Sequence, residues 1–94
     1  MSLPFKFCIP QSVVSRTVGS ETILFDLQSS SYYSLNEVGG RFWRLVQEGN
    51  DVQRILSILT NEFEVDRPKL EADIGHLARQ LRDLGLLQSG VDGV

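Results

Sequence analysis

The chain has 94 residues, 41% of them hydrophobic and 22% charged, with a formal net charge of −3. This length and composition favour one globular domain, the negative charge argues against a nucleic-acid binder, and the single cysteine, Cys8, excludes an internal disulfide. No run approaches the roughly 20 apolar residues that a membrane span needs, so we expect a cytoplasmic protein that contacts neither nucleic acid nor a membrane.

The first residues lack the long apolar region and the cleavage site of a secretory signal. Two prolines, Pro4 and Pro10, favour an extended arm over residues 1–11. Phe5, Phe7 and Ile9 alternate along it. The arm is therefore expected to lay one apolar edge on the body of the domain.

Three β-rich runs follow. The first two, Val13–Val18 and Glu21–Leu27, are separated by Gly19-Ser20, which predicts a hairpin with a type II′ turn. A polar turn then leads to a third strand, Ser31–Leu35. Together the runs predict a three-stranded antiparallel meander.

A helix is predicted to start directly after the third strand. Asn36 is placed to cap it, and Glu37 puts a negative charge at the positive end of the helix dipole. Apolar residues recur at helical spacing as far as Val46, and Gly49 is a natural C-terminal signal. Gly39-Gly40 lies inside this helix, which indicates close backbone packing.

Two more helices complete the expected fold. Asp51 is placed to cap the second, and Asp66 the third, with Pro68 tolerated in its first turn. Leucines and isoleucine on the third helix form a stripe that ends at Gly85. We therefore predict an α+β, winged-helix-turn-helix-like domain over residues 12–88, with three strands followed by three helices. Residues 89–94 are expected to form a disordered tail.

The residue types needed for chemistry are scarce. The only histidine, His76, is expected at the surface of the third helix, and Cys8 has no neighbouring cation to activate it. Neither a metal site nor a catalytic constellation is predicted, and no cofactor is expected. The chain is expected not to be an enzyme.

A DNA-binding winged helix remains an alternative. The third helix carries Arg67, Lys69, Arg79 and Arg82, but acidic residues are interspersed among them. Mixed signs are typical of a solvated face. The alternative is therefore retained as the less favoured interpretation.

The third strand has an edge of serines and tyrosines over Ser29–Ser34, without charge or proline to shield it. Two interpretations stay open from the residues alone. The edge is a short and harmless one, or it is a docking line for an extended peptide.

Three motifs in this order resemble the PqqD-like family of peptide-recognition elements. They are Tyr33-Ser34-Leu35-Asn36 with Val38-Gly39 and Trp43, then Glu62-Phe63-Glu64-Val65-Asp66, then Leu81-Arg82-Asp83-Leu84-Gly85-Leu86-Leu87. The resemblance covers residues 12 to 88. It implies a non-catalytic module that binds the leader segment of a ribosomally made precursor peptide as an added strand and presents it to a separate maturation enzyme.

The resemblance places the peptide along the third strand and against the third helix. The expected peptide-binding residues are Ser30, Ser31, Tyr32, Tyr33, Ser34, Leu35, Asp73, Leu77, Gln80 and Arg82. The chain departs from the pyrroloquinoline quinone protein, in which the segment between the second and third strands is longer and the Leu-Asn-x-x-Gly junction is missing.

Asn36 and Gly39 instead look like the broader branch associated with lasso peptides and radical-SAM enzymes. The expected partners are a precursor peptide and a leader peptidase or radical-SAM enzyme. A peptide chaperone of pyrroloquinoline quinone biosynthesis is the alternative within the family.

Overall fold

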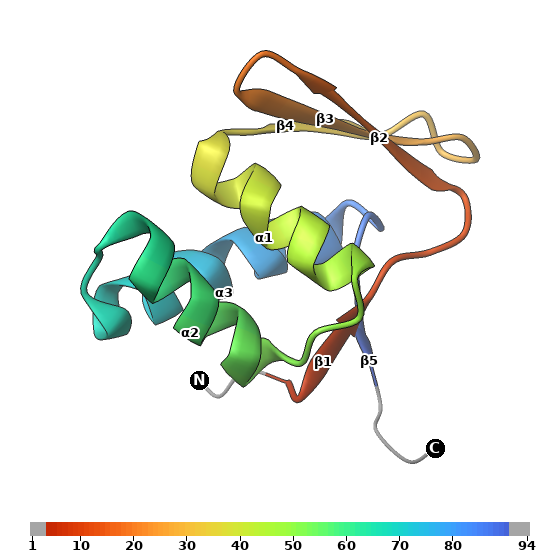
Figure 1. The fold of residues 1–94 in the computed structure, drawn as a ribbon. Helices are drawn as coiled ribbons and strands as arrows, with labels where there is room; N and C mark the ends of the chain where they lie inside the picture. The colour runs from red at the N-terminus through yellow and green to blue at the C-terminus, as the bar shows by residue number, and fades with distance from the viewer. Residues whose placement is uncertain (1–3, 91–94) are drawn as a thin grey trace.

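The structure is a computed structural model that describes residues 4–90. Three antiparallel strands form its upper layer in Figure 1. They are β2 (Val13–Val18), β3 (Glu21–Asp26) and β4 (Tyr32–Leu35), in the spatial order β2-β3-β4. Gly19, in the β2–β3 turn, has a φ of +63°, as the first central residue of a type II′ turn requires. The predicted meander is confirmed.

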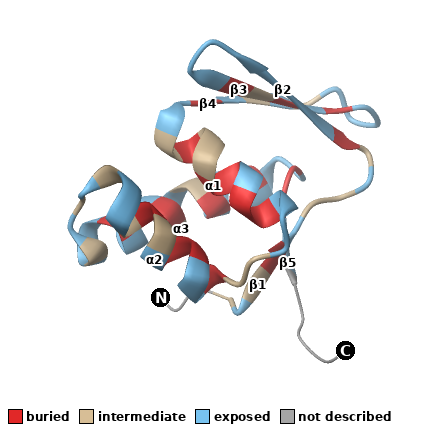
Figure 2. Cartoon of the chain, viewed as in Figure 1, coloured by how far each residue is buried: buried red, intermediate tan, exposed pale blue. Residues whose placement is uncertain are grey.

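Side chains alternate between the two faces of the sheet. Thr22, Leu24 and Leu35 are buried on the inner face. Phe25 and Tyr32, on the outer face, are 37% and 69% exposed. Figure 2 accordingly shows much of the sheet in the colour of exposed residues, while the helix beneath it has buried segments among intermediate and exposed ones. The sheet thus contributes one face to the core.

All three helices lie on the inner side of the sheet in Figure 1: α1 (Glu37–Gln47), α2 (Val52–Phe63) and α3 (Arg67–Asp83). The Asn36 side chain accepts from the Gly39 N–H at 2.9 Å, and Asp51 accepts from the Arg54 N–H at 2.8 Å. These two of the three predicted side-chain caps are confirmed. The third prediction is wrong: Asp66 occupies the N-cap position of α3, but its side chain makes no capping hydrogen bond.

The two glycines of α1 bring this helix onto the sheet. A Cβ on Gly40 would lie 2.6 Å from the hydroxyl oxygen of Thr22, and one on Gly39 would lie 3.3 Å from the Cβ of Leu35. Real Cβ atoms essentially never approach another atom as closely as the first distance. Close packing therefore explains this glycine pair, as the sequence indicated.

The core lies among the sheet and the three helices. Its largest fully buried side chains are Trp43, Phe42, Leu24, Leu45, Ile55, Leu56, Leu59, Leu81, Leu86, Leu87 and Val52. Burying each leucine contributes roughly 1.5–3 kcal/mol. The apolar stripe predicted on the third helix comprises Leu70, Ile74, Leu77, Leu81 and Leu84. It is wrong at its end, because Leu84 is 39% exposed. Ala78 is buried instead, at the spacing that continues from Leu70 and Ile74.

Two short strands, one near each end of the described part of the chain, pair with each other, which the sequence did not predict. β1 (Lys6–Cys8) pairs antiparallel with β5 (Gln88–Gly90), and Phe7 is buried against the core. The expected separate arm over 1–11 and the expected tail over 89–94 therefore each contribute a short strand. Residues 1–3 and 91–94 lie outside the described part of the chain.

None of the helices within residues 4–90 is long and apolar enough to cross a membrane.

Candidate functional site

A groove runs between β4 and α3. Its volume is about 340 Å³, and its lining comes from the end of β4, the start of α1, Val65 and one side of α3. The lining residues are Tyr33, Ser34, Leu35, Asn36, Val38, Gly39, Val65, Lys69, Leu70, Asp73, Ile74 and Leu77. A sheet edge and a helix thus form two walls of one depression.

β4 lies at the edge of the sheet, since it pairs only with β3. The Asp26 N–H donates to the Ser31 carbonyl at 2.9 Å, which marks that pair as a hydrogen-bonded position. Such positions alternate along an antiparallel ladder. In the observed register Tyr33 lies opposite Leu24 and Leu35 opposite Thr22, so both residues direct their main-chain groups toward β3.

The intervening residues of β4 direct their main chain the other way. Tyr32 and Ser34 occupy the non-bonded positions of the β3–β4 ladder. Their N–H and C=O groups therefore point to the open edge, beside the groove. The alternation also distinguishes Ser31 from Ser34, either of which the sequence alone allowed to face the open edge. The Ser34 N–H faces that edge, whereas the Ser31 N–H donates to the Ser29 hydroxyl at 3.2 Å.

Hydrogen bonds and close contacts define both ends of the groove. At one end α1 starts directly on β4, because Asn36 caps the helix and Gly39 lies against Leu35. At the other end the Tyr33 hydroxyl donates to Gln80 Oε1 at 2.8 Å. Gln80 follows Leu77 by one helical turn. The second contact therefore joins the strand wall to the helix wall.

The groove has an apolar floor and a polar rim. Leu35, Leu70 and Ile74 are buried, while Lys69 and Asp73 stand exposed at the rim. Lys69 Nζ lies 3.5 Å from Asp73 Oδ2, an exposed pair of the kind that contributes little to stability. Both charges are thus accessible to an incoming peptide.

The turn that presents β4 is built on Asp26. Its carboxylate accepts from the Gln28 N–H at 3.0 Å and from the Ser29 hydroxyl at 3.0 Å. The bond from the Gln28 N–H is the main cause that holds the pKa of Asp26 below its usual value, followed by one from the Ser12 side chain. Ser30 has a φ of 65° and donates its N–H to the Asp26 carbonyl, so it shapes the turn ahead of the edge.

The structure brings together most of the residues expected at the site. Tyr33, Ser34, Leu35, Asp73 and Leu77 line the groove. Gln80 closes its end through Tyr33. Ser30 and Ser31 lie in the turn before β4, and Tyr32 is exposed on the outer face.

Arg82 lies farthest from expectation, on another side of α3. It lines a separate hollow on α3 with His76 and Arg79. Residues nine apart on a helix lie roughly 180° apart around its axis, which separates Arg82 from Asp73.

Several groove residues were missed by the sequence analysis, namely Asn36, Val38, Gly39, Val65, Lys69, Leu70 and Ile74. Lys69 had a usable signal, because it precedes Asp73 by four residues and Leu77 by eight, the spacing of one helix face. Val38 had none, since it reaches the groove only through the direction in which α1 leaves β4.

The site offers main-chain pairing and an apolar slot. Among residues 4–90, no three His, Cys, Asp or Glu side chains lie close enough together to hold a metal ion. An extended peptide is the ligand that uses both features, because its main chain would bond the edge while alternate side chains enter the groove.

Comparison with known proteins agrees with this geometry. Residues 21–87 match the family model described as "Coenzyme PQQ synthesis protein D (PqqD)". A solved structure described as "TbiB1 in Complex with the TbiA(beta) Leader Peptide" has 36% sequence identity and a TM-score of 0.81, covering 89% of this chain and 98% of that chain.

A second similar structure is "Lasso peptide synthetase B1 complexed with the leader peptide", with 24% identity, a TM-score of 0.78, and coverage of 87% of this chain and 96% of that chain. At this identity the likeness shows the shared fold. A search of curated proteins found no match. The family model spans most of this chain, and the leader-peptide complex described first is 36% identical to it in sequence. The resemblance seen in the sequence motifs is therefore confirmed. The chain belongs to the PqqD family.

Proposed function

We propose that this protein captures the leader segment of a ribosomally made precursor peptide by adding it as a strand to β4. The observation that carries the proposal is the pair of main-chain sites at Tyr32 and Ser34, which face an open edge directly beside the groove. The similar structure at 36% identity is itself described in complex with a leader peptide.

Selectivity would come from the side chains of the leader. Main-chain pairing is available to any peptide, whereas residues that alternate toward α3 must fit the slot formed by Leu35, Ile74 and Leu77. Apolar side chains suit that floor. A charged residue of the leader would find its partner at the rim, on Lys69 or Asp73.

The bound leader would then be presented to a separate maturation enzyme, a leader peptidase or a radical-SAM enzyme. A groove that holds the leader along one edge leaves the remainder of the precursor free to enter another active site. The chain itself would supply recognition and no catalytic group.

The direct test removes one edge N–H. Ser34→Pro deletes the donor that faces the open edge, and proline is tolerated at a sheet edge because no ladder bond is lost. We expect its affinity for the cognate leader peptide, measured by calorimetry, to fall by about tenfold or more, since the ring also blocks the approach of the added strand.

Ser34→Ala is the matched control, because it removes the hydroxyl and keeps the N–H. It should bind the leader within about twofold of the unmodified protein. Circular dichroism should show the same helical content in both variants. Undiminished binding by a folded Ser34→Pro protein would exclude strand addition at β4.

A further inference from the structure

The turn between β3 and β4 contains a residue in a conformation that favours glycine. Ser30 has a φ of 65°, and Glu64 is the one other non-glycine residue with a positive φ in the described part of the chain. A residue with a side chain adopts this left-handed region at a cost and stays there only when its surroundings hold it. The contacts that hold Ser30 lie directly ahead of the edge strand β4.

The main chain of Asp26 makes two of these contacts. Its carbonyl accepts from the Ser30 N–H at 2.8 Å, and its N–H donates to the Ser31 carbonyl at 2.9 Å. In a regular antiparallel pair the Ser31 N–H would donate back to the Asp26 carbonyl. Here it donates to the Ser29 hydroxyl at 3.2 Å instead. The turn thus departs from the regular ladder at the residue that precedes β4.

The carboxylate of Asp26 holds the same Ser31 N–H through Ser29. The Ser29 hydroxyl donates to Asp26 Oδ2 at 3.0 Å while it accepts from Ser31. Asp26 is only 7% exposed, and hydrogen bonds to an ionised acceptor are stronger than those between neutral groups. Ser31 is therefore held on both sides by one residue, directly at its carbonyl and through Ser29 at its N–H.

These contacts determine where the Tyr32 N–H points. The peptide unit between Ser31 and Tyr32 is planar and trans, so its C=O and its N–H point in opposite directions. Because the Ser31 carbonyl points at Asp26 on β3, the Tyr32 N–H points away from β3, toward the open edge. This N–H is one of the main-chain groups to which we propose that the leader binds.

We propose that Asp26 and Ser29 are positioning residues for leader binding, which hold Ser31 so that the Tyr32 N–H faces the leader before it arrives. The inference rests on the proposed capture of a leader by β4. A donor whose direction is fixed in the free protein needs less ordering on association. Without the Ser29 hydroxyl the Ser31 N–H loses its acceptor, and the start of β4 is free to adopt other directions.

Ser29→Ala tests the role of the hydroxyl, and because Ser29 is exposed its truncation spares the core. We expect the affinity for the cognate leader peptide, measured by calorimetry, to fall by about two- to tenfold, the equivalent of one hydrogen bond. Ser29→Thr keeps the hydroxyl and should restore the affinity to within about twofold. Gln28→Ala is the matched control, because Gln28 donates to Asp26 through its main-chain N–H and its side chain is exposed.

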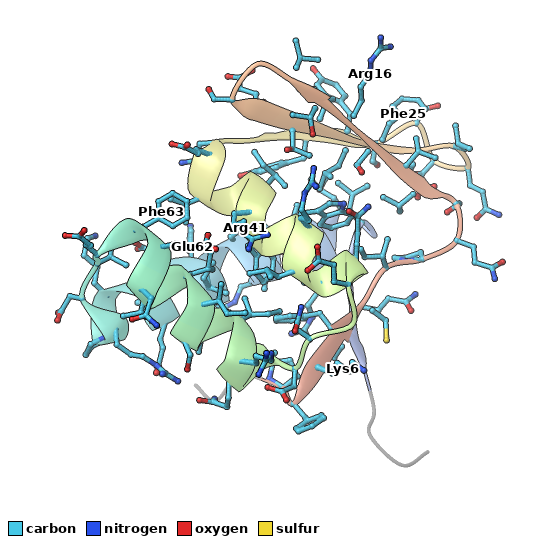
Figure 3. All side chains as sticks on the ribbon, in the orientation of Figure 1. Lys6, Arg16, Phe25, Arg41, Glu62 and Phe63 are labelled. Atoms are coloured by element: carbon cyan, nitrogen blue, oxygen red, sulfur yellow. The ribbon has the colours of Figure 1, made fainter. Side chains whose placement is uncertain are left out.

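NMR of the free protein measures the positioning without any leader. Phe25 and Tyr32 are opposite each other at a non-bonded position of the ladder, where the main chains of two strands approach most closely. Figure 3 shows the Phe25 side chain on the outer face of the sheet, away from the helices. We expect a strong NOE between the two Hα atoms in the unmodified protein and in Ser29→Thr, and a weaker one in Ser29→Ala. Thermal unfolding should show that all these variants remain folded.

Asp26→Asn tests whether the carboxylate acts through Ser29. It should lower the affinity for the leader, because a neutral amide oxygen is a weaker acceptor than a carboxylate. In the Ser29→Ala background the same change should cost less, since both residues act on one N–H. Equal costs in the two backgrounds would overturn the assignment of Asp26.

The two measurements on Ser29→Ala must change together. An unchanged affinity overturns the proposal, as does a loss of affinity that Ser29→Thr fails to restore. Weaker binding with an unchanged NOE would mean that Ser29 contacts the leader itself, which also overturns a positioning role. An unmodified protein that shows the strong NOE but does not bind the leader would contradict the proposed function instead, so the two failures are distinguishable.

Discussion

The Tyr33 hydroxyl donates to Gln80 Oε1 at 2.8 Å across 47 positions of sequence. This bond joins β4 to α3, the two walls between which we propose that the leader lies. It fixes their separation at the end of the groove nearest Leu77. A groove whose walls are held apart before the peptide arrives needs less reorganisation on binding.

Tyr33→Phe removes this tether and keeps the ring. We expect the affinity for the leader to fall by about two- to tenfold, the equivalent of one exposed hydrogen bond. Calorimetry with the cognate leader measures it. Tyr32→Phe is the control, since that hydroxyl lies on the outer face of the sheet and should be dispensable. Equal affinities for both variants would show that the tether does not shape the groove.

Gly40→Ala should destabilise the fold although alanine is the better helix former. The new Cβ would lie 2.6 Å from the Thr22 hydroxyl oxygen and 3.3 Å from the Thr22 Cβ. Overpacking of this kind costs about 1–3 kcal/mol, against a gain of up to about 1 kcal/mol in helix propensity. A lower midpoint of urea unfolding is the expected result.

Thr22→Ala provides the second half of a double-mutant cycle for this contact. In the Thr22→Ala background, Gly40→Ala should cost less, because the clashing oxygen is gone. Equal costs in the two backgrounds would locate the strain elsewhere.

The order and type of the central elements could be predicted because their signals are local. Alternation marks β3 and β4, Asn36 and Asp51 mark helix starts, and Gly49 and Gly85 have the positive φ values expected where helices end. Each signal lies within a few residues of the feature that it predicts. Such features need no knowledge of the rest of the fold.

The pairing of β1 with β5 could not be predicted in this way. Each strand has three residues. The alternation of Phe5, Phe7 and Ile9 predicted an apolar edge but no partner strand, and the partner lies about 80 residues away in the sequence.

Only part of the groove could be predicted, because some of its residues are brought together by packing between elements distant in sequence. Leu77 could be assigned to the margin of the stripe on α3, whereas Val38 and Val65 meet there only after the helices are packed.

Asp26 should make the stability of the fold depend on pH in the acid range. Its pKa is lowered from 3.8 in the folded protein, so its contribution is present above pH 3.8 and is lost as the pH falls through the folded-state value. Asp26→Asn removes this titration. We expect the variant to be less stable at neutral pH, with the difference from the unmodified protein shrinking as the pH falls.

Urea unfolding of both proteins at a series of pH values measures this difference. The comparison isolates Asp26 from Glu62, whose pKa is also lowered by its hydrogen bond from Arg41, since Glu62 titrates in both proteins. A difference in stability that stays constant through the acid range would assign the effect to something other than the charge of Asp26.

If the groove holds the leader, substitution of Leu77 should lower the affinity for the leader and substitution of Arg82 should leave it unchanged. Leu77 lines the groove, whereas Arg82 lines the hollow that includes His76. Leu77→Ala should weaken leader binding by about tenfold or more, as expected for the loss of an apolar contact worth roughly 1.5–3 kcal/mol when buried. Arg82→Ala should bind the leader unchanged at physiological salt. Because Leu77 is only partly buried, the fold should survive its truncation, which thermal unfolding would verify. Loss of binding in Arg82→Ala with retention in Leu77→Ala would move the peptide to the opposite side of α3.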